Sequence, residues 1–522
     1  MNLLKTLTLG LLAVALPSMA SAQTVIHITG STAFRAPTTC AIVTGLGGIG
    51  TCRAIWTGSS TFLKGTSSLL ANGTIGSGGT ATVIVECNWT GSLAGVVDVA
   101  TQHALAFPDE TNSTNIAAIN GSNTLVTTNF TGGTSGFISA GFATTSTTVA
   151  PDVCMSDAFA SSCAKALSTC TITGTGALTG TITTGTQLAA AINAAPLREA
   201  GSSSPIVGAG TAAGYLGIVP FQWAMGNMSG SVATPSGTTT SITNITQQTA
   251  AFLVKTGFAP LSMFSATGTD LASTDTTEFV YLVGRNEDSG TRIDAFAEPQ
   301  LGFIANPSQY FLTFSGGANT STIPVPTDYV QIGGNSAVGG TASLVESFNP
   351  WTSGSTLNTE SRITWNLSGH GGYAGGGDVA SVLSSPVDQA NVFNTSSPAG
   401  ENAGNAYFIG YLAVSDSGAF NNGTSKGLNV LTYDGVAAST VGIQNGSYSF
   451  WSYEHMYYLS TASTAVQTFA NTAANNIATT FVSFGSSGTS SSTAPSGVKL
   501  LTNGTAGAVK RTIEGGAYVL NY

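Results

Sequence analysis

The sequence predicts an α/β fold, and three observations indicate it. Many short β-prone runs are cut by Gly, Asn and Ser, which is typical of strands joined by uncharged loops. Residues 247–254 have the periodicity of a helix, whereas residues 280–283 are typical of a strand. Between residues 279 and 297, a β-prone run, a polar turn and a helical pattern follow one another, as they do in α/β sandwiches.

The first 22 residues have the pattern of a secretory signal peptide. Lys5 supplies the positive end, an apolar run extends from Leu7 to Leu16, and Ala20-Ser21-Ala22 fits the small-x-small cleavage rule. The apolar run is too short to span a membrane. No Cys follows the cleavage site, so a lipid anchor is not indicated. We therefore expect an exported protein, periplasmic or at the cell surface or outside the cell, whose mature chain starts at Gln23.

Composition excludes several classes of protein. Charged residues make up 7% of the 522 residues and hydrophobic residues 42%, so the chain can bury a core and is not disordered. No window after the signal peptide holds 18 uninterrupted apolar residues, which argues against a membrane protein. The net charge is −10 and the 14 Lys and Arg residues form no cluster, so nucleic acid is not expected as a partner. An anion would have to be held by a few well-placed donors.

Cysteines and histidines predict disulfides and no metal. The six cysteines are Cys40, Cys52, Cys87, Cys154, Cys163 and Cys170. In an exported protein an even number favours disulfides, with Cys40–Cys52 and a link among Cys154, Cys163 and Cys170 as plausible local pairs. The four histidines, at positions 27, 103, 370 and 455, lie far apart and form no metal-binding motif. No metal or other cofactor is expected.

Two short motifs match patterns of enzymes by composition alone. Residues 45–50 satisfy G-x-G-x-x-G, but no clear helix follows, so we do not expect a dinucleotide site. Residues 423–427 satisfy G-x-S-x-G, but they follow a loop instead of a strand, so a nucleophile elbow is not expected.

The most informative stretch surrounds Arg285. The β-prone run Phe279–Val283 brings Arg285 to a strand end, and residues 288–291 (Asp-Ser-Gly-Thr) can cap a helix that runs through Ile293, Phe296 and Ala297. Free N–H groups at a helix start together with a guanidinium suit a tetrahedral oxyanion. Alternatively, this is a capped helix whose Arg pairs with Glu287 or Asp288. The residues alone leave both interpretations open.

Arg285 with Ser289-Gly290-Thr291 resembles the central signature of phosphate ABC transporter substrate-binding proteins, a branch of the periplasmic binding protein superfamily. Five further segments resemble that family in the same order along the chain. They are residues 25–37 (VIHITGSTAFRAP), 153–158 (VCMSDA), 369–380 (GHGGYAGGGDVA), 408–412 (FIGYL) and 443–448 (IQNGSY).

The resemblance implies a two-lobed, type II-like fold in which each lobe is a mixed sheet flanked by helices. The first lobe would comprise residues 23–220 and the returning residues 412–522, and the second lobe residues 221–411. Crossovers near residues 217–220 and 409–411 would form the hinge, and the ligand would lie in the cleft between the lobes. The resemblance implies a binding protein and not an enzyme.

The resemblance also implies which residues bind the oxyanion. They are Ser31, Thr32 and the Phe34 amide in the first turn, Ser92, Asp157, and Arg285, Ser289, Gly290 and Thr291 from the other lobe. A carboxylate can only accept hydrogen bonds. Asp157 would therefore accept a hydrogen bond from protonated phosphate and disfavour fully ionised sulfate.

The chain departs from the family pattern at several positions. Ala33 replaces a usual hydroxyl, and Glu287 and Asp288 stand where the family commonly has Asp and Gly. Ser/Thr/Gly-rich insertions lie around residues 58–80, 108–150 and 171–203, and could decorate the rim, mediate self-assembly or obstruct docking to a transporter. Three functions remain open: capture of phosphate or a related oxyanion for uptake with an ABC permease, a secreted or cell-surface structural role on the same fold, or an exported hydrolase. A hydrolase has only the G-x-S-x-G match.

An aromatic group lies near the C-terminal end: Phe450, Trp451, Tyr453, Tyr457 and Tyr458. Aromatic side chains of this kind can form a platform for carbohydrate. The 450/453/457 spacing instead predicts one face of a helix packed on a core.

Overall fold

The computed structural model describes part of the chain. The described residues are 23–58, 62–63, 66, 68–74, 82–127, 130, 135–139, 141–145, 148–168, 172–173, 182, 184–201, 215–226, 242–264, 279–302, 309–314, 345–350, 366–367, 371–373, 375–383, 393–394, 406–418, 428–484, 497–498, 509–510 and 520–521. The predicted signal peptide, Cys170, His370 and the G-x-S-x-G segment lie outside them.

A mixed sheet dominates the described residues. Its order is β10-β11-β16-β8-β19-β5-β1-β4-β3-β2, with β17 also paired to β8 and β7 to β19. The strands are β1 (Thr24–Gly30), β2 (Arg53–Thr57), β3 (Ser68–Thr74), β4 (Thr82–Asn88), β5 (Val153–Ser156), β7 (Leu197–Glu199), β8 (Gly217–Met225), β10 (Phe258–Pro260), β11 (Phe279–Val283), β16 (Ala406–Ala413), β17 (Asn429–Val430) and β19 (Trp451–Leu459).

Helices and short strand pairs complete the described elements. The helices are α1 (Arg35–Gly45), α2 (Ser92–Thr101), α3 (Ser113–Ile119), α4 (Ala160–Leu167), α5 (Gly185–Ala194), α6 (Gln247–Thr256), η2 (Leu261–Phe264), α7 (Gly290–Ala297), α9 (Gly376–Leu383), α10 (Val414–Gly418), α11 (Thr440–Gln444), α12 (Thr464–Asn476) and η5 (Ile477–Phe481). The remaining strands are β6 (Ile172–Thr173), β9 (Asn244–Ile245), β12 (Tyr310–Phe314), β13 (Val345–Pro350), β14 (Asn366–Leu367), β15 (Phe393–Asn394), β18 (Thr432–Tyr433), β20 (Val509–Lys510) and β21 (Leu520–Asn521).

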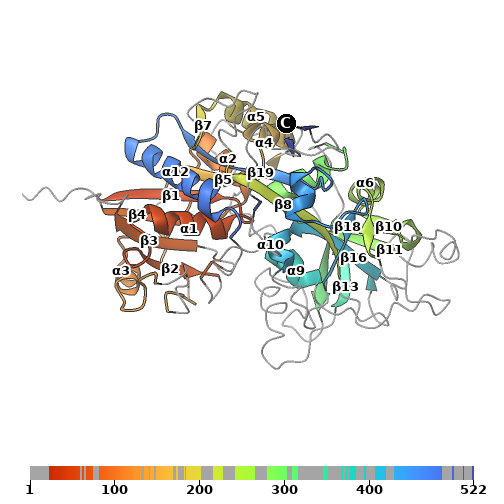
Figure 1. The fold of residues 1–522 in the computed structure, drawn as a ribbon, viewed down its shortest axis with the longest axis horizontal. Coiled ribbons are helices and arrows are strands. Elements are labelled where there is room, and N and C mark those ends of the chain that lie inside the picture. The colour runs from red at the N-terminus through yellow and green to blue at the C-terminus, as the bar shows by residue number, and fades with distance from the viewer. Residues whose placement is uncertain are drawn as a thin grey trace, which may run out of the picture.

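The sheet has two sides joined through its middle strands (Figure 1). On the β1 side, β1 lies parallel to both β4 and β5; on the β16 side, β16 lies parallel to β11. Strand β8 pairs with β19 over residues 217–220 and with β16 over residues 221–225. One strand therefore carries the backbone hydrogen bonding from one side of the sheet to the other.

Helices cover both faces of the β1 side. Along β5, Val153 and Met155 belong to a core cluster that includes residues of α1 and α12, whereas Cys154 belongs to a second cluster with residues of α2, α4 and α5. Side chains of a strand alternate between faces, so this division places the two groups of helices on opposite faces. A strand buried on both faces needs no polar side, which explains the nearly continuous apolar runs of the chain.

The predicted α/β class with mixed sheets and flanking helices is confirmed, and the hydrogen-bonded path between the two sides is continuous. The predicted helix at residues 247–254 and the strand at 280–283 are confirmed as α6 and β11. The lobe limits at residues 220 and 411 stay a prediction; they fall inside β8 and β16, the strands that pair in the middle of the sheet.

The disulfide prediction is wrong for the described cysteines that it paired. Cys40, Cys52, Cys87 and Cys154 are buried thiols. Burial raises the pKa of the Cys52 thiol to about 12 and that of Cys87 well above its usual value. Spacing suggested a local Cys40–Cys52 bond, but both side chains pack into the apolar core, where a thiol behaves as a small hydrophobic group. Cys154 does not take part in the predicted link with Cys163 and Cys170.

The helix predicted for the aromatic group is also wrong. Residues 451–459 form β19, which lies between β8 and β5 and is buried along almost its whole length. Trp451, Tyr453 and Tyr457 have the two-residue spacing of a strand, so the 450/453/457 interpretation compared the aromatic residues with the wrong period. Phe450, Trp451 and Tyr453 are at most 1% exposed, so they form core and not a surface platform.

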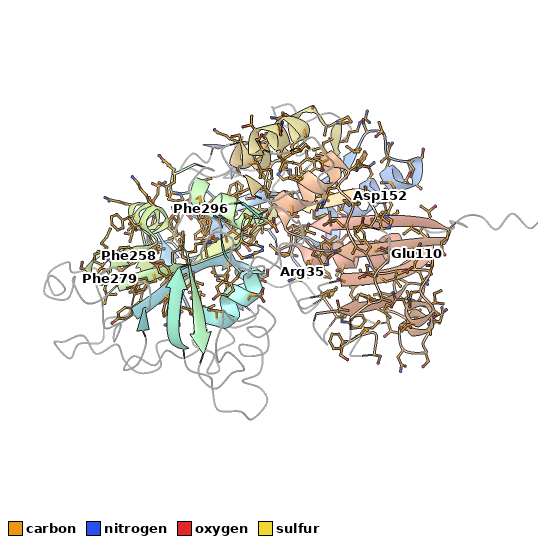
Figure 2. The ribbon with its side chains drawn as sticks, turned by 180° about the vertical axis from the view of Figure 1, so that it is seen from behind. Arg35, Glu110, Asp152, Phe258, Phe279 and Phe296 are labelled. Carbon is orange, nitrogen blue, oxygen red and sulfur yellow. The ribbon has the colours of Figure 1, made fainter. Side chains whose placement is uncertain are left out.

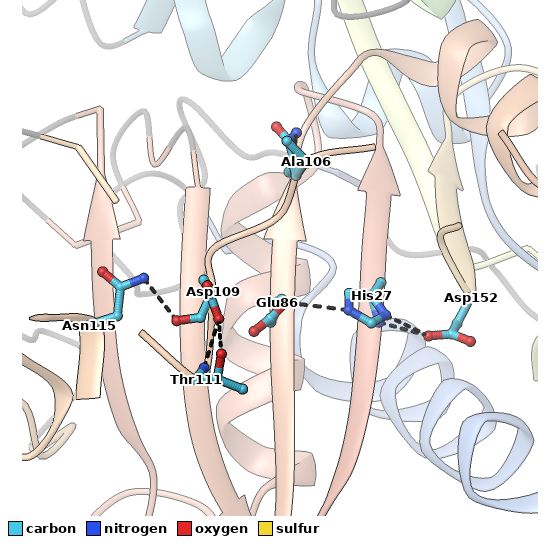
Figure 3. A network of polar contacts seen from close by, with 8 residues as sticks. His27, Glu86, Ala106, Asp109, Thr111, Asn115 and Asp152 are labelled. Carbon is cyan, nitrogen blue, oxygen red and sulfur yellow. Dashed lines mark hydrogen bonds and ion pairs between the residues drawn. The ribbon is translucent and has the colours of Figure 1, made fainter. Parts of the chain in front are cut away.

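A charged network fixes the middle of β1 (Figure 3). The His27 ring lies between two carboxylates, with Nε2 3.4 Å from Glu86 Oε2 and Nδ1 3.2 Å from Asp152 Oδ2. Burial alone would lower the pKa of His27, but hydrogen bonds to Asp152 and Glu86 raise it to about 9. Burial raises the pKa of Glu86 to about 7 against the opposing effect of His27. This charged histidine links β1 to β4 and to the residue before β5.

His27 is expected to make stability depend on pH. Its pKa is about 9 in the folded chain against 6.5 for the free side chain, so its contribution is complete below the lower value and is lost as pH rises through about 9. We expect His27→Gln to lower the unfolding free energy by roughly 2 kcal/mol near neutral pH and by little near pH ~10. Urea unfolding across this range measures the difference. An equal loss at every pH would show that His27 acts through packing alone.

Candidate functional site

Three predicted segments meet where β4, β1 and β5 end. These strands are parallel neighbours, so their carboxyl ends lie at one edge of the sheet, the usual place for ligands in α/β proteins. Gly30 ends β1, and its carbonyl accepts a hydrogen bond from the Gly91 amide at 2.9 Å. The Ser31 amide donates to the Met155 carbonyl at 2.8 Å. The turns carrying Ser31, Ser92 and Asp157 are therefore held side by side.

Asp157 is the centre of a buried cluster. Its carboxylate accepts hydrogen bonds from the hydroxyls of Ser92 and of Thr291, the latter at 3.1 Å. Its main-chain carbonyl accepts a hydrogen bond from the Ser452 hydroxyl. Burial raises the pKa of Asp157, and Ser92, Arg285 and Thr291 oppose that shift. The carboxylate keeps lone pairs beyond those used by the two hydroxyls and can still accept a hydrogen bond from a ligand.

Helices α2 and α7 both start at this cluster. The Leu93 amide donates to the Asp288 carbonyl at 3.0 Å, which ties the start of α2 to the turn before α7. Ser289 caps α7, because its hydroxyl accepts a hydrogen bond from the Arg292 amide at 3.4 Å. The positive ends of two helices therefore point at the Asp157 region.

The start of α7 needs a glycine. A β-carbon on Gly290 would lie 1.8 Å from Asp157 Oδ1 and 2.8 Å from the Ser92 β-carbon. Close approach of the α7 backbone thus lets the hydroxyls of residues 92 and 291 reach the same carboxylate.

Arg285 is buried, with 1% of its surface exposed. Its Nη2 donates to Thr32 Oγ1 at 3.2 Å and its Nε to the Tyr373 carbonyl at 3.1 Å. It therefore reaches from the turn after β11 to the first turn after β1. The sequence analysis offered Glu287 and Asp288 as structural partners of Arg285. Burial raises the pKa of Glu287 to about 7, and the charge of Arg292 opposes this rise.

Arg35, which the sequence analysis did not select, lies beside the same residue. Its Nε donates to the Thr32 carbonyl at 2.9 Å and its Nη1 to the Thr66 carbonyl at 2.9 Å. Figure 2 shows Arg35 between the two sides of the sheet. Two guanidinium groups, one from each side, are therefore anchored on Thr32. The signal available in the sequence was the Arg directly after the first turn, at the start of α1.

Helix α1 starts without a side-chain cap. Phe34 is its N-cap residue, and its fully buried aromatic ring cannot accept the first amide hydrogens. The first amide groups of a helix lack internal partners, and the helix dipole favours an anion there. Amide donors and the Arg35 guanidinium thus occur within one short segment, which Arg285 also reaches through Thr32.

Three further acidic residues were not predicted. Glu454 is fully buried, and burial raises its pKa well above the usual value, with Asp157 adding to the shift and the Ser31 hydroxyl opposing it. Asp378 and Asp416 lie near the start of α9. Burial raises the pKa of both carboxyl groups, and the positive charges of Arg285 and Arg35 oppose this rise. These side chains come from segments far apart in sequence; Asp378 lies in the segment 369–380 that resembles the family, but it was not selected as a site residue.

The structure thus brings most of the predicted residues together. Ser92, Asp157, Gly290 and Thr291 form one contact cluster, capped by Ser289 on α7. Thr32 and Arg285 form a second contact, and Ser31 and Phe34 flank Thr32 in the same turn. That these nine residues bind a ligand stays a prediction.

Within the described ranges, no group of three or more His, Cys, Asp or Glu side chains could hold a metal ion. A search of the same residues finds no helix that is long and apolar enough to cross a membrane.

Gly290→Ala is expected to destabilise the protein by about 2 kcal/mol, because the new methyl group must displace the Asp157 carboxylate from its hydroxyl partners. Thermal unfolding measures the loss. Gly377→Ala on α9 is the matched control, since a β-carbon there has no neighbour within 4 Å. Equal stability of the two variants would contradict the close packing at residue 290.

Comparisons with known proteins give distant structural likeness only. No model of a known protein family matches the chain, and no curated protein matches its sequence. Among solved structures, the chain is similar to a phosphate ABC transporter substrate-binding protein from Clostridium perfringens with bound phosphate, at 12% identity and a TM-score of 0.29, covering 86% of this chain and 92% of that one. It is similar to PstS from Borrelia burgdorferi at 9% identity and a TM-score of 0.27, covering 86% and 92%.

A third solved structure is an ABC-type phosphate transport receptor from Vibrio cholerae, at 9% identity and a TM-score of 0.29, covering 86% of this chain and 93% of that one. The structures from Clostridium perfringens and Vibrio cholerae are thus described as phosphate transport proteins. At these TM-scores the likeness does not establish a common site geometry, and the contacts of this chain's own residues have to carry any functional conclusion.

Proposed function

We propose that this protein is an exported solute-binding protein that captures phosphate or a related tetrahedral oxyanion. The observation that carries the proposal is the convergence of Arg285 and Arg35 on Thr32. Two guanidinium groups that meet at one residue bring several N–H donors to one place, and an anion with several oxygen atoms can accept from them. A guanidinium fork also fits the oxygen atoms of a tetrahedral oxyanion.

The surrounding donors support an oxyanion as the ligand. The uncapped start of α1 adds amide groups next to Thr32, and helices α2 and α7 start at the neighbouring Asp157 cluster. Such an arrangement supplies short-range hydrogen bonds, which an acidic protein needs in order to hold an anion against its overall charge.

Binding without catalysis is the simplest use of these groups. The described histidines each contact carboxylates: His27 with Glu86 and Asp152, His103 with Asp98, and His455 with Glu199. The Ser92 hydroxyl donates to the Asp157 carboxylate, which also accepts from Thr291, so this pair of contacts ties α2 to α7. We further propose that the bound oxyanion is delivered to an ABC permease for uptake.

Isothermal titration of the phosphate-stripped mature protein with phosphate and sulfate tests the proposal. We expect phosphate to bind and Arg285→Ala to lose about a hundredfold or more in affinity, because a buried charge-assisted contact is removed. Arg198→Ala is the matched control: Arg198 is exposed on β7. No heat from either anion in a folded sample would reject oxyanion binding and favour a structural role.

Arg35→Ala should weaken phosphate binding by about tenfold, a smaller loss than at Arg285 because Arg35 is partly exposed and screened by solvent. The same titration measures it, with Arg35→Lys as a second variant that keeps the charge and loses the fork. Wild-type affinity in Arg35→Ala would remove Arg35 from the site.

A further inference from the structure

Two carboxylates that the proposed function does not use lie at the start of α9. Asp378 Oδ2 accepts a hydrogen bond from the Gly375 amide at 2.8 Å. Asp416, on α10, packs against the same turn, since a β-carbon on Gly376 would lie 1.9 Å from its Oδ2. Two acidic side chains from different helices are thus held against one short glycine-rich turn.

The turn before α9 is bound directly to Arg285. The Tyr373 carbonyl accepts hydrogen bonds from Arg285 Nε at 3.1 Å and from the Asn286 amide at 3.0 Å, while the Tyr373 amide donates to the Gly284 carbonyl at 2.9 Å. Asp416 follows β16, which lies parallel to β11, the strand before Arg285. Residues that follow parallel neighbours lie at the same edge of the sheet. Both acidic residues therefore reach the region of Arg285 by independent routes.

The charges of this region do not cancel. Arg35 from α1 and Arg285 from the turn after β11 act on Asp378, and the same two residues act on Asp416 together with Asp378 and Asp157. The guanidinium groups of Arg35 and Arg285 thus lie near three carboxyl groups, those of Asp157, Asp378 and Asp416. A fully ionised oxyanion would place its oxygens against acceptors that cannot donate, whereas an oxyanion that retains a proton can donate to one of them.

We propose that Asp378 and Asp416 determine specificity at the Arg285–Arg35 site, admitting oxyanions that retain a proton and rejecting fully ionised ones. This rests on the proposed oxyanion-binding function. Asp157 accepts two hydroxyl hydrogen bonds and Asp378 accepts one from the Gly375 amide, so the acidic pair beside α9 supplies carboxylate acceptors in addition to Asp157.

The pH dependence of sulfate binding follows from this arrangement. Burial raises the pKa of Asp416 to about 6, and Asp378 and Asp157 add to the shift against the effect of the two arginines. As pH falls through about 6, Asp416 gains a proton, one negative charge is removed and a donor appears. Sulfate stays fully ionised across this range, so any gain in its affinity reports on the protein. We expect roughly tenfold tighter sulfate binding near pH ~5.5 than near pH ~8.

The test is titration of the wild-type protein, Asp378→Asn, Asp416→Asn and the double variant with sulfate and phosphate at both pH values. Asn keeps the shape and supplies an N–H donor, so each variant should bind sulfate about tenfold more tightly near pH ~8, with a flatter pH profile. Asp109→Asn is the matched control, since Asp109 lies in a surface turn with Thr111. The wild-type pH profile needs no mutation and stands even where a variant fails to fold.

The outcomes separate this inference from the proposed function. Phosphate binding that is lost in Arg285→Ala, with an unchanged phosphate-to-sulfate ratio in the Asn variants and a flat sulfate profile in wild type, would overturn the specificity role and leave oxyanion binding intact. Absence of binding by the wild-type protein and by every Asn variant would overturn both. Gain of sulfate affinity in the Asn variants alone, with the control unchanged, supports the role of Asp378 and Asp416.

Discussion

Arg285 and Arg35 donate hydrogen bonds to the same residue, Thr32, from opposite sides of the sheet. Holding two guanidinium groups this close costs free energy, and the surrounding structure compensates for it in several ways. Asp378 and Asp416 lie near both arginines, and the turn before α9 accepts a hydrogen bond from Arg285. Helix α1 begins with Arg35, α7 follows Arg285, and α9 and α10 carry Asp378 and Asp416. Each of these four helices therefore carries or adjoins a charged group of this region.

The Asp157 cluster complements that pair. It uses hydroxyls and a carboxylate to tie α2 and α7 together, and the close approach at Gly290 brings the turn after β11 to the β1 side of the sheet. Strand β8 links the same two sides through the backbone. The two sides of the sheet are therefore joined by polar side-chain contacts at the strand ends and by continuous backbone hydrogen bonding in the interior. A ligand with oxygen atoms on several sides could bind both groups of donors at once.

Much of the fold could be predicted from local patterns. The strand before Arg285, the cap at Ser289 and helix α7 depend on short-range hydrogen bonding and periodicity, and the structure has all three. The same reasoning failed for β19, because the 450/453/457 spacing was compared with a helix although Trp451, Tyr453 and Tyr457 also have the two-residue spacing of a strand. It failed for Cys40 and Cys52 because sequence spacing does not show whether a thiol faces a partner or the core.

The sequence by itself determined the α/β class, the strand–turn–helix around Arg285 and the residue types suited to an anion, since these depend on neighbours within a few positions. Only the tertiary structure decided that Arg285 reaches Thr32, that Asp157 accepts hydrogen bonds from two distant hydroxyls, and that Asp378 and Asp416 reach the same region. Those contacts join residues up to hundreds of positions apart. They arise because parallel strands end at a common edge, and one chain's local pattern does not encode which strands will be neighbours.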